Sequence, residues 1–97
     1  MTKATADNLP KDDTVNTNQK LRTFDLIREA VVPEFRDRVA EYLSLYEEAL
    51  HDDNARSDDL RASANQLRGY LRGLNTTRVL GMADWEELDR RIAESWL

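Results

Sequence analysis

The chain divides into a polar N-terminal segment and a longer segment whose apolar residues recur every three or four positions. This spacing is typical of amphipathic helices, and it predicts four of them, over about 19–31, 33–51, 58–80 and 84–96. Pro33 predicts a break between the first two, because proline lacks a backbone N–H and disfavours the helical conformation at the residue before it. A kinked helix that continues through Pro33 is the alternative. No segment alternates like a β-strand, so the predicted fold class is all-α.

Local signals set the limits of the last two predicted helices. Gly81 is a typical residue to end the third helix. Asp84 and Glu87 have the spacing of a capping box, in which two side chains satisfy the first backbone N–H groups. We therefore expect the fourth helix to begin at Asp84.

The N-terminal segment, residues 1–19, contains only Leu9 and Val15 as large apolar residues after Met1. A segment with so little to bury cannot offset the conformational entropy that it loses on ordering. We expect a flexible tail over 1–19 and a single helical domain over 20–97. An alternative role for the tail is that of an arm that orders on a partner.

The short loop over 52–57 predicts that the second and third helices form an antiparallel hairpin, with the shorter helices flanking it in a small bundle. Residues that face each other in such a pair have numbers with a constant sum. A sum of 109 directs four residues of the second helix at the third: Phe35, Tyr42, Leu45 and Ala49. The same register aligns three opposite charges: Glu48 with Arg61, Glu41 with Arg68, and Asp37 with Arg72. It predicts a charge ladder that leaves little free positive charge on the third helix.

The second helix carries apolar residues on more than one side: Tyr42, Leu43, Leu45, Tyr46 and Leu50. If one side faces the third helix, part of the remaining apolar surface needs another cover. A domain of this length also buries a modest core and lies near the margin of stability. Both observations favour completion of the bundle by dimerisation, for which two-fold symmetry is the common arrangement.

The third helix has a stripe of small and polar residues opposite its leucines. Gly69 and Gly73 lie in it, although glycine inside a helix costs about 1 kcal/mol relative to alanine. Such a pair indicates the close approach of another helix, either the first or fourth helix of this chain or a helix of a partner. Trp96 would fray at the C-terminus unless it docks. The predicted partner or dimer interface comprises Ala62, Gln66, Gly69, Gly73, Thr76, Tyr46 and Trp96.

Composition narrows the candidate chemistry. The 97 residues include no cysteine and one histidine, which excludes a disulfide scaffold, a thiol nucleophile and a histidine-based metal cluster. We therefore expect no cofactor and no metal. The net charge of −5 disfavours general nucleic-acid binding, which needs a basic surplus. No apolar run is long enough for a membrane span and no signal-peptide pattern is present, so a cytoplasmic location is expected.

These observations favour a small acidic helical module that binds another protein as an inhibitor, anti-activator or adaptor. It is expected to be a homodimer and not an enzyme. Two alternatives use the same arginines, Arg61, Arg68 and Arg72, which lie close together on the helical wheel. One is a regulator that associates with nucleic acid, and the other is a small dimeric enzyme that binds an anionic metabolite.

Overall fold

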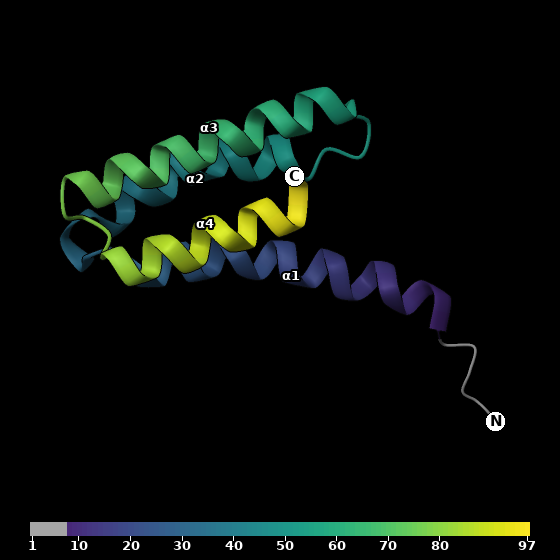
Figure 1. The fold of residues 1–97 in the computed structure, drawn as a ribbon, viewed down its shortest axis with the longest axis horizontal. Helices are drawn as coiled ribbons and strands as arrows, with labels where there is room; N and C mark the ends of the chain where they lie inside the picture. Colours follow the sequence, from purple (N-terminus) through teal and green to yellow (C-terminus); the bar gives the residue numbers. More distant parts are fainter. Residues whose placement is uncertain (1–7) are drawn as a thin grey trace.

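Four helices run alternately up and down in the computed structural model, which describes the backbone of residues 8–97 and the side chains of residues 18–97 (Figure 1). The elements are α1 (Asn8–Ala30), the 3₁₀ turn η1 (Pro33–Phe35), α2 (Arg36–Leu50), α3 (Ser57–Thr76) and α4 (Met82–Trp96). Each helix contacts the next, and α4 returns to lie against α1. Residues 8–97 contain no strand. The predicted all-α class and small helical bundle are confirmed.

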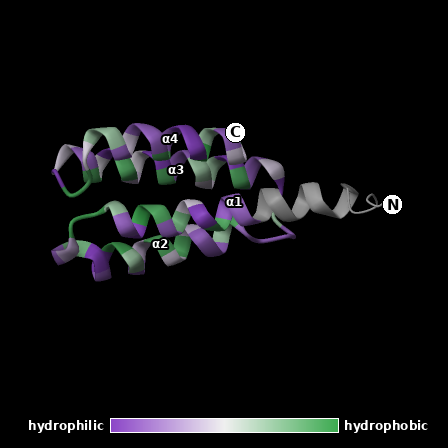
Figure 2. Cartoon of the chain, turned by 90° about the horizontal axis from the view of Figure 1, so that it is seen from below, coloured by the Kyte–Doolittle hydropathy of each residue, from purple (hydrophilic) through white to green (hydrophobic). Residues whose placement is uncertain are grey.

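The core lies along the axis that the four helices share. Figure 2 shows them as two layers, α1 with α2 and α3 with α4, with hydrophobic residues recurring among polar ones along each helix. Thirteen buried apolar side chains fill the space between them: Phe24, Ile27, Val31, Val39, Leu43, Leu50, Ala64, Leu67, Leu71, Val79, Leu80, Leu88 and Ile92. Complete burial of one such large side chain stabilises the fold by about 1.5–3 kcal/mol.

The predicted break at Pro33 is confirmed, because α1 ends at Ala30 and η1 begins at Pro33. The Arg36 side chain spans this break. The last carbonyl groups of a helix lack partners within the helix. The Arg36 guanidinium donates hydrogen bonds to the carbonyl oxygens of Arg28 at 3.0 Å and Val31 at 3.2 Å. The first residues of the next helix thus cap the end of α1, which holds η1 and α2 close to it.

The start of α1 differs from the prediction. The helix begins at Asn8, so the expected start near residue 19 is wrong. A helix that has formed its first turn gains one hydrogen bond for each added residue, so it can extend through a segment with few large apolar residues. Residues 1–7 lie outside the described residues. The flexibility of 1–19 and the domain boundary at residue 20 stay predictions.

The turn between α3 and α4 also differs. Helix α3 ends at Thr76, before the predicted residue 80, and Arg78 adopts the left-handed conformation with φ 66°. This conformation is commonly supplied by glycine after a helix, but Gly81 has φ −67° and precedes α4 instead. The Asn75 side-chain amide donates a 3.0 Å hydrogen bond to the carbonyl of Leu80 and closes the turn. Gly81 as the stop residue is therefore wrong.

The predicted capping box of α4 is also wrong. The helix begins at Met82, and no side chain caps its first N–H groups. Asp84 instead lies inside the first turn. A carboxylate there interacts favourably with the partial positive charge at a helix N-terminus, which accounts for the same sequence signal without a cap.

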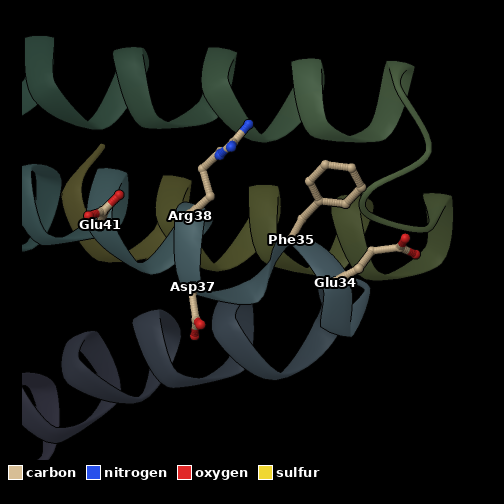
Figure 3. A pocket seen from close by; sticks show the side chains of 5 residues that line it. All are labelled: Glu34, Phe35, Asp37, Arg38 and Glu41. Atoms are coloured by element: carbon tan, nitrogen blue, oxygen red, sulfur yellow. The ribbon is translucent and has the colours of Figure 1, made fainter.

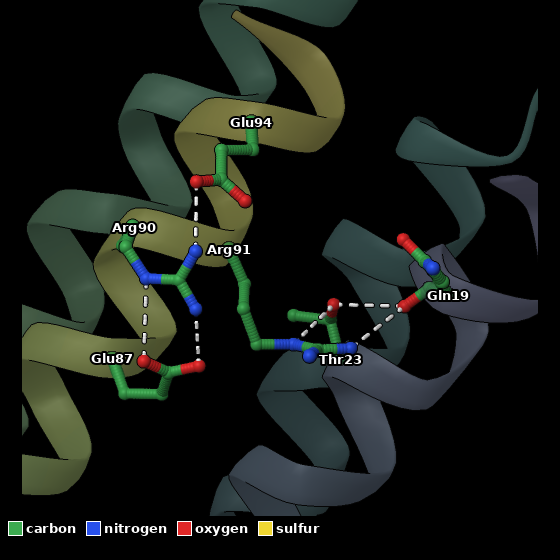
Figure 4. Close-up of polar contacts among 6 residues, drawn as sticks. All are labelled: Gln19, Thr23, Glu87, Arg90, Arg91 and Glu94. Atoms are coloured by element: carbon green, nitrogen blue, oxygen red, sulfur yellow. Dashed lines mark hydrogen bonds and ion pairs between the residues drawn. The ribbon is translucent and has the colours of Figure 1, made fainter.

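An arginine of α4 ties this helix to α1 (Figure 4). Arg91 donates hydrogen bonds to the Thr23 hydroxyl and to the Gln19 carbonyl, both at 3.3 Å. The buried Thr23 hydroxyl in turn donates to the same carbonyl at 3.0 Å. The neighbouring Arg90 stays within α4, where it pairs with two glutamates. Because Arg91 supplies a partner for the only buried polar residue described, it helps to fix the approach of α4 to α1.

Candidate interaction surface

Helix α2, together with Phe35 just before it, presents a row of exposed residues that are not part of the core. Phe35 is 40% exposed, Tyr42 54% and Leu45 65%. With exposed Arg38 and Ala49 they recur at alternating intervals of three and four residues, the spacing of a coiled-coil contact row. We call this row the α2 seam: Phe35, Arg38, Tyr42, Leu45 and Ala49.

The α2 seam overturns the predicted register of the hairpin. A sum of 109 would turn these residues toward α3 and place Val39 opposite Tyr70. Instead Val39 is buried, and the Tyr70 ring lies 5.7 Å from that of Tyr42 and 5.9 Å from that of Tyr46. Helix α2 must face α1 as well as α3. Its buried side is the stripe of Val39, Leu43 and Leu50, which belongs to the same core cluster as residues of α1 and α3.

Acidic residues border the α2 seam on one edge. Glu34, Glu41 and Glu48 follow one another at intervals of seven residues, and all three are exposed. None of them forms an ion pair within residues 18–97. We call this set the glutamate row. Phe35 and Arg38 of the α2 seam project to one side of the backbone, whereas Asp37 projects to the opposite side (Figure 3).

The edge of the α2 seam that faces α3 is formed by tyrosine rings. Tyr70 is half-buried between Tyr42 and Tyr46, with its ring nearly parallel to that of Tyr46 at an interplanar angle of 26°. Burial raises the pKa of Tyr70 above its ordinary value, and the nearby Tyr42 and Tyr46 raise it further. The hydroxyl therefore stays neutral across the physiological range. The cluster can offer a partner aromatic surface together with hydroxyl groups.

The predicted glycine stripe lies on the outer side of α3. Its five residues are all exposed: Ala62, Gln66, Gly69, Gly73 and Thr76. We call it the glycine face. A Cβ atom added at Gly69 or Gly73 would meet no atom within 4 Å apart from its chain neighbours and the nearby backbone of α3 itself. The possibility that the first or fourth helix of this chain fills the stripe is therefore wrong. Its role in an interface with another chain stays a prediction.

The two aromatic residues of the predicted interface, Tyr46 and Trp96, do not lie on the glycine face. Tyr46 packs on Tyr70, as described above. Trp96 is half-buried, with its ring 6.0 Å from that of Phe24 and 6.2 Å from that of His51. Trp96 is therefore docked within this chain, and a role of Tyr46 or Trp96 in an interface with another chain stays a prediction.

The predicted charge ladder between the second and third helices is wrong. Among residues 18–97, no ion pair joins α2 to α3. Arg68 turns instead to α4, where its guanidinium donates two hydrogen bonds to the Asp89 carboxylate, at 2.7 and 3.0 Å. This hydrogen bond with Asp89 is the main cause that raises the pKa of Arg68. Helices α2 and α3 do not pack in the predicted register, so the oppositely charged residues of the predicted ladder do not come together.

The remaining arginines of the predicted anion-binding set are exposed. Arg61 and Arg72 have no ion-pair partner in the described part of the chain. Arg72 lines an open hollow with Arg68, Asn65 and Trp85 between α3 and α4. The hollow also contains Asp89, which engages Arg68. The structure thus leaves two exposed arginines on this face, and the third is neutralised.

Metal and membrane sites receive no support from the described residues. No three histidine, cysteine, aspartate or glutamate side chains are grouped there so that they could hold a metal ion. None of the helices between residues 8 and 97 is long and apolar enough to cross a membrane. Comparison with protein-family models, curated proteins and solved structures found no match to the chain.

Sequence reasoning did not identify the α2 seam as the exposed surface. It assigned Phe35, Tyr42, Leu45 and Ala49 to the contact with the third helix, and it did not single out Arg38 or Glu34. Two signals were available. Apolar residues on more than one side of the second helix indicated surplus surface, and the alternating intervals of three and four residues indicated where that surface lies.

Proposed function

We propose that this protein is a helical interaction module that binds another protein through the α2 seam. The observation that carries the proposal is the exposure of Phe35, Tyr42 and Leu45 in one periodic row. Isolated exposed apolar residues are common on proteins. Contiguous apolar surface bordered by charge is instead typical of interaction sites, and aromatic residues are enriched among their anchors.

The proposed biochemical role is that of a non-enzymatic inhibitor, anti-activator or adaptor in the cytoplasm. Self-association is a separate proposal and uses the glycine face. Its support is the open space above Gly69 and Gly73, because neither residue is required for close packing inside the chain. A two-fold pair of α3 helices would give these glycines the close contact that the single chain does not.

Binding through the α2 seam can be tested with two matched substitutions. Leu45→Gln and Met82→Gln remove side chains of nearly equal exposure, 65% and 64%, from different helices. We expect proteins captured by the immobilised wild-type chain to be lost with Leu45→Gln and retained with Met82→Gln. Equal capture by both variants would contradict the proposal.

A second candidate function is association with nucleic acid, favoured by the exposure of Arg61 and Arg72. Retention on heparin at moderate salt, abolished by changing both arginines to Gln, would support it. The net charge of −5 opposes it. An enzyme that binds an anionic metabolite would use the same arginines, and a rise in melting temperature with that metabolite would be its sign.

A further inference from the structure

We infer that the occupant of the α2 seam is an amphipathic helix of another protein with lysine or arginine along its edge, and not a second copy of this chain. The inference rests on the proposed function and adds the chemistry of the partner. Three features carry it: the spacing of the seam, the charge of its one free edge, and the result of pairing the seam with itself.

The spacing of the α2 seam fits a helix. Residues at alternating intervals of three and four form one straight stripe, which meets an equivalent stripe on a second helix with side chains interlocked. Tyr42 and Leu45 lie near the centre of the stripe and are its most exposed large apolar residues. Arg38 adds an aliphatic stem that can cover apolar surface while its charge stays in water. A partner helix would therefore present apolar residues at the same intervals.

Only one edge of the α2 seam is open to a partner's charges. In a pair of helices, the residues that flank the contact row determine the choice of partner. One flank of this seam consists of Val39 and Tyr46, which are buried and half-buried. The other flank is the glutamate row, which carries three negative charges without ion-pair partners among the described residues. Charge complementarity therefore selects a helix with basic residues on the facing edge.

Pairing of the α2 seam with itself brings like charges together in both directions. In an antiparallel pair centred on the seam, Glu41 faces its own copy and Glu34 faces the second Glu48. In a parallel pair, Arg38 faces its own copy. Like charges placed opposite one another oppose association. The seam thus disfavours a second copy, and self-association of the chain falls to the glycine face.

The inference can be tested with two synthetic peptide helices of 21 residues. Both carry leucine at alternating intervals of three and four; one has lysine at the flanking positions and the other has glutamate. Affinity is measured by fluorescence anisotropy below the concentration at which each peptide self-associates. We expect the wild-type protein to bind the lysine peptide at least about fivefold more tightly at low ionic strength, with a ratio that falls as salt rises.

Two sets of variants separate the charged edge from general attraction to an acidic protein. The triple change Glu34→Lys, Glu41→Lys and Glu48→Lys should reverse the preference. The matched control changes three exposed acidic residues of α1 and α4 and alters net charge equally: Glu29→Lys, Asp84→Lys and Glu86→Lys. The control should retain the preference for the lysine peptide. Equal loss of preference in both triple variants would overturn the inference.

Leu45→Gln distinguishes failure of this inference from failure of the proposed function. If it weakens binding of the peptides while the glutamate row has no effect on their ratio, the seam binds helices but does not select basic ones. If it weakens neither peptide, the seam itself is not the binding surface. A wild-type dimer that Leu45→Gln dissociates in sedimentation experiments would also overturn the inference, because the occupant would then be a second copy.

Discussion

Helices α2 and α4 have the same length, 15 residues, but divide their apolar residues differently. In α4 four of the five large apolar side chains are buried or half-buried, namely Trp85, Leu88, Ile92 and Trp96, and only Met82 at the first position of the helix is exposed. In α2 only Val39, Leu43 and Leu50 are buried, while Phe35, just before the helix, Tyr42 and Leu45 face solvent.

The difference shows which surface the fold leaves available. Most of the large apolar residues of α4 pack in the core, where α4 contacts α1 and α3. Their burial stabilises the fold, and this role explains why they are apolar. The residues of the α2 seam contribute little to the core and expose apolar area to water, which is unfavourable unless something covers them. In this bundle, α4 serves mainly the fold and α2 serves both the fold and the proposed interface.

The largest expected effect contrasts the two sides of α2 itself. Leu43→Ala empties a fully buried position and should lower the free energy of unfolding by about 2–5 kcal/mol. Leu45→Ala, two residues away, should change it by no more than about 0.5 kcal/mol, because the side chain is already exposed. Urea denaturation of both variants measures the contrast. Similar losses in the two would show that Leu45 is part of the core.

The glycine face permits a substitution that strengthens α3. Gly69→Ala should raise the free energy of unfolding by up to about 1 kcal/mol, since alanine favours the helix and its Cβ meets no neighbour. Gly69→Leu should weaken self-association without lowering the melting temperature, as measured by light scattering and thermal denaturation on one sample. A clear fall in melting temperature at unchanged mass would contradict an open glycine face.

The corrected ion pairs predict a smaller effect. A double-mutant cycle on Arg68 and Asp89 should give a favourable coupling of about 0.5–1 kcal/mol at low salt, since the pair is bidentate but partly exposed. The equivalent cycle on Arg68 and Glu41 should give no coupling. Chemical denaturation of the four variants in each cycle decides between them. A favourable coupling between Arg68 and Glu41 would show that the predicted charge ladder forms after all.

The smallest effect concerns alkaline pH and the tyrosines beside the α2 seam. The pKa of Tyr70 is raised on folding. The stability that this group contributes is therefore fully present below the unfolded pKa of about 10, and it is lost as pH rises through the folded pKa. Tyr70→Phe should reduce the loss of stability between neutral pH and pH 11, as measured by urea denaturation. An unchanged alkaline loss would show that Tyr70 is not responsible.

How much the sequence could reveal depended on the number of apolar stripes in each helix. Helix α4 has one stripe, so Trp85, Leu88, Ile92 and Trp96 were correctly placed together. Helix α2 has two, and both satisfy the helical period. Which of the two stripes is buried depends on where α1 packs. The residue patterns of the second and third helices do not show the position of α1.

Two other errors had similarly local causes. The hairpin by itself predicts that Arg68 pairs with Glu41, whereas the partner of Arg68 in the structure is Asp89 of α4. The left-handed residue after α3 is Arg78, a residue type with no preference for that conformation, so glycine was the better expectation. In both cases tertiary contacts, among them the hydrogen bond from Asn75 to Leu80, outweigh the local signal.

Amide chemical-shift mapping can show whether the α2 seam is the surface that binds a partner. In a titration of the isotope-labelled protein with the lysine peptide, we expect the largest shift changes at the α2 seam, the glutamate row and Tyr70. We expect small changes along α4. The largest changes on α4, or evenly distributed across the acidic surface, would contradict this expectation.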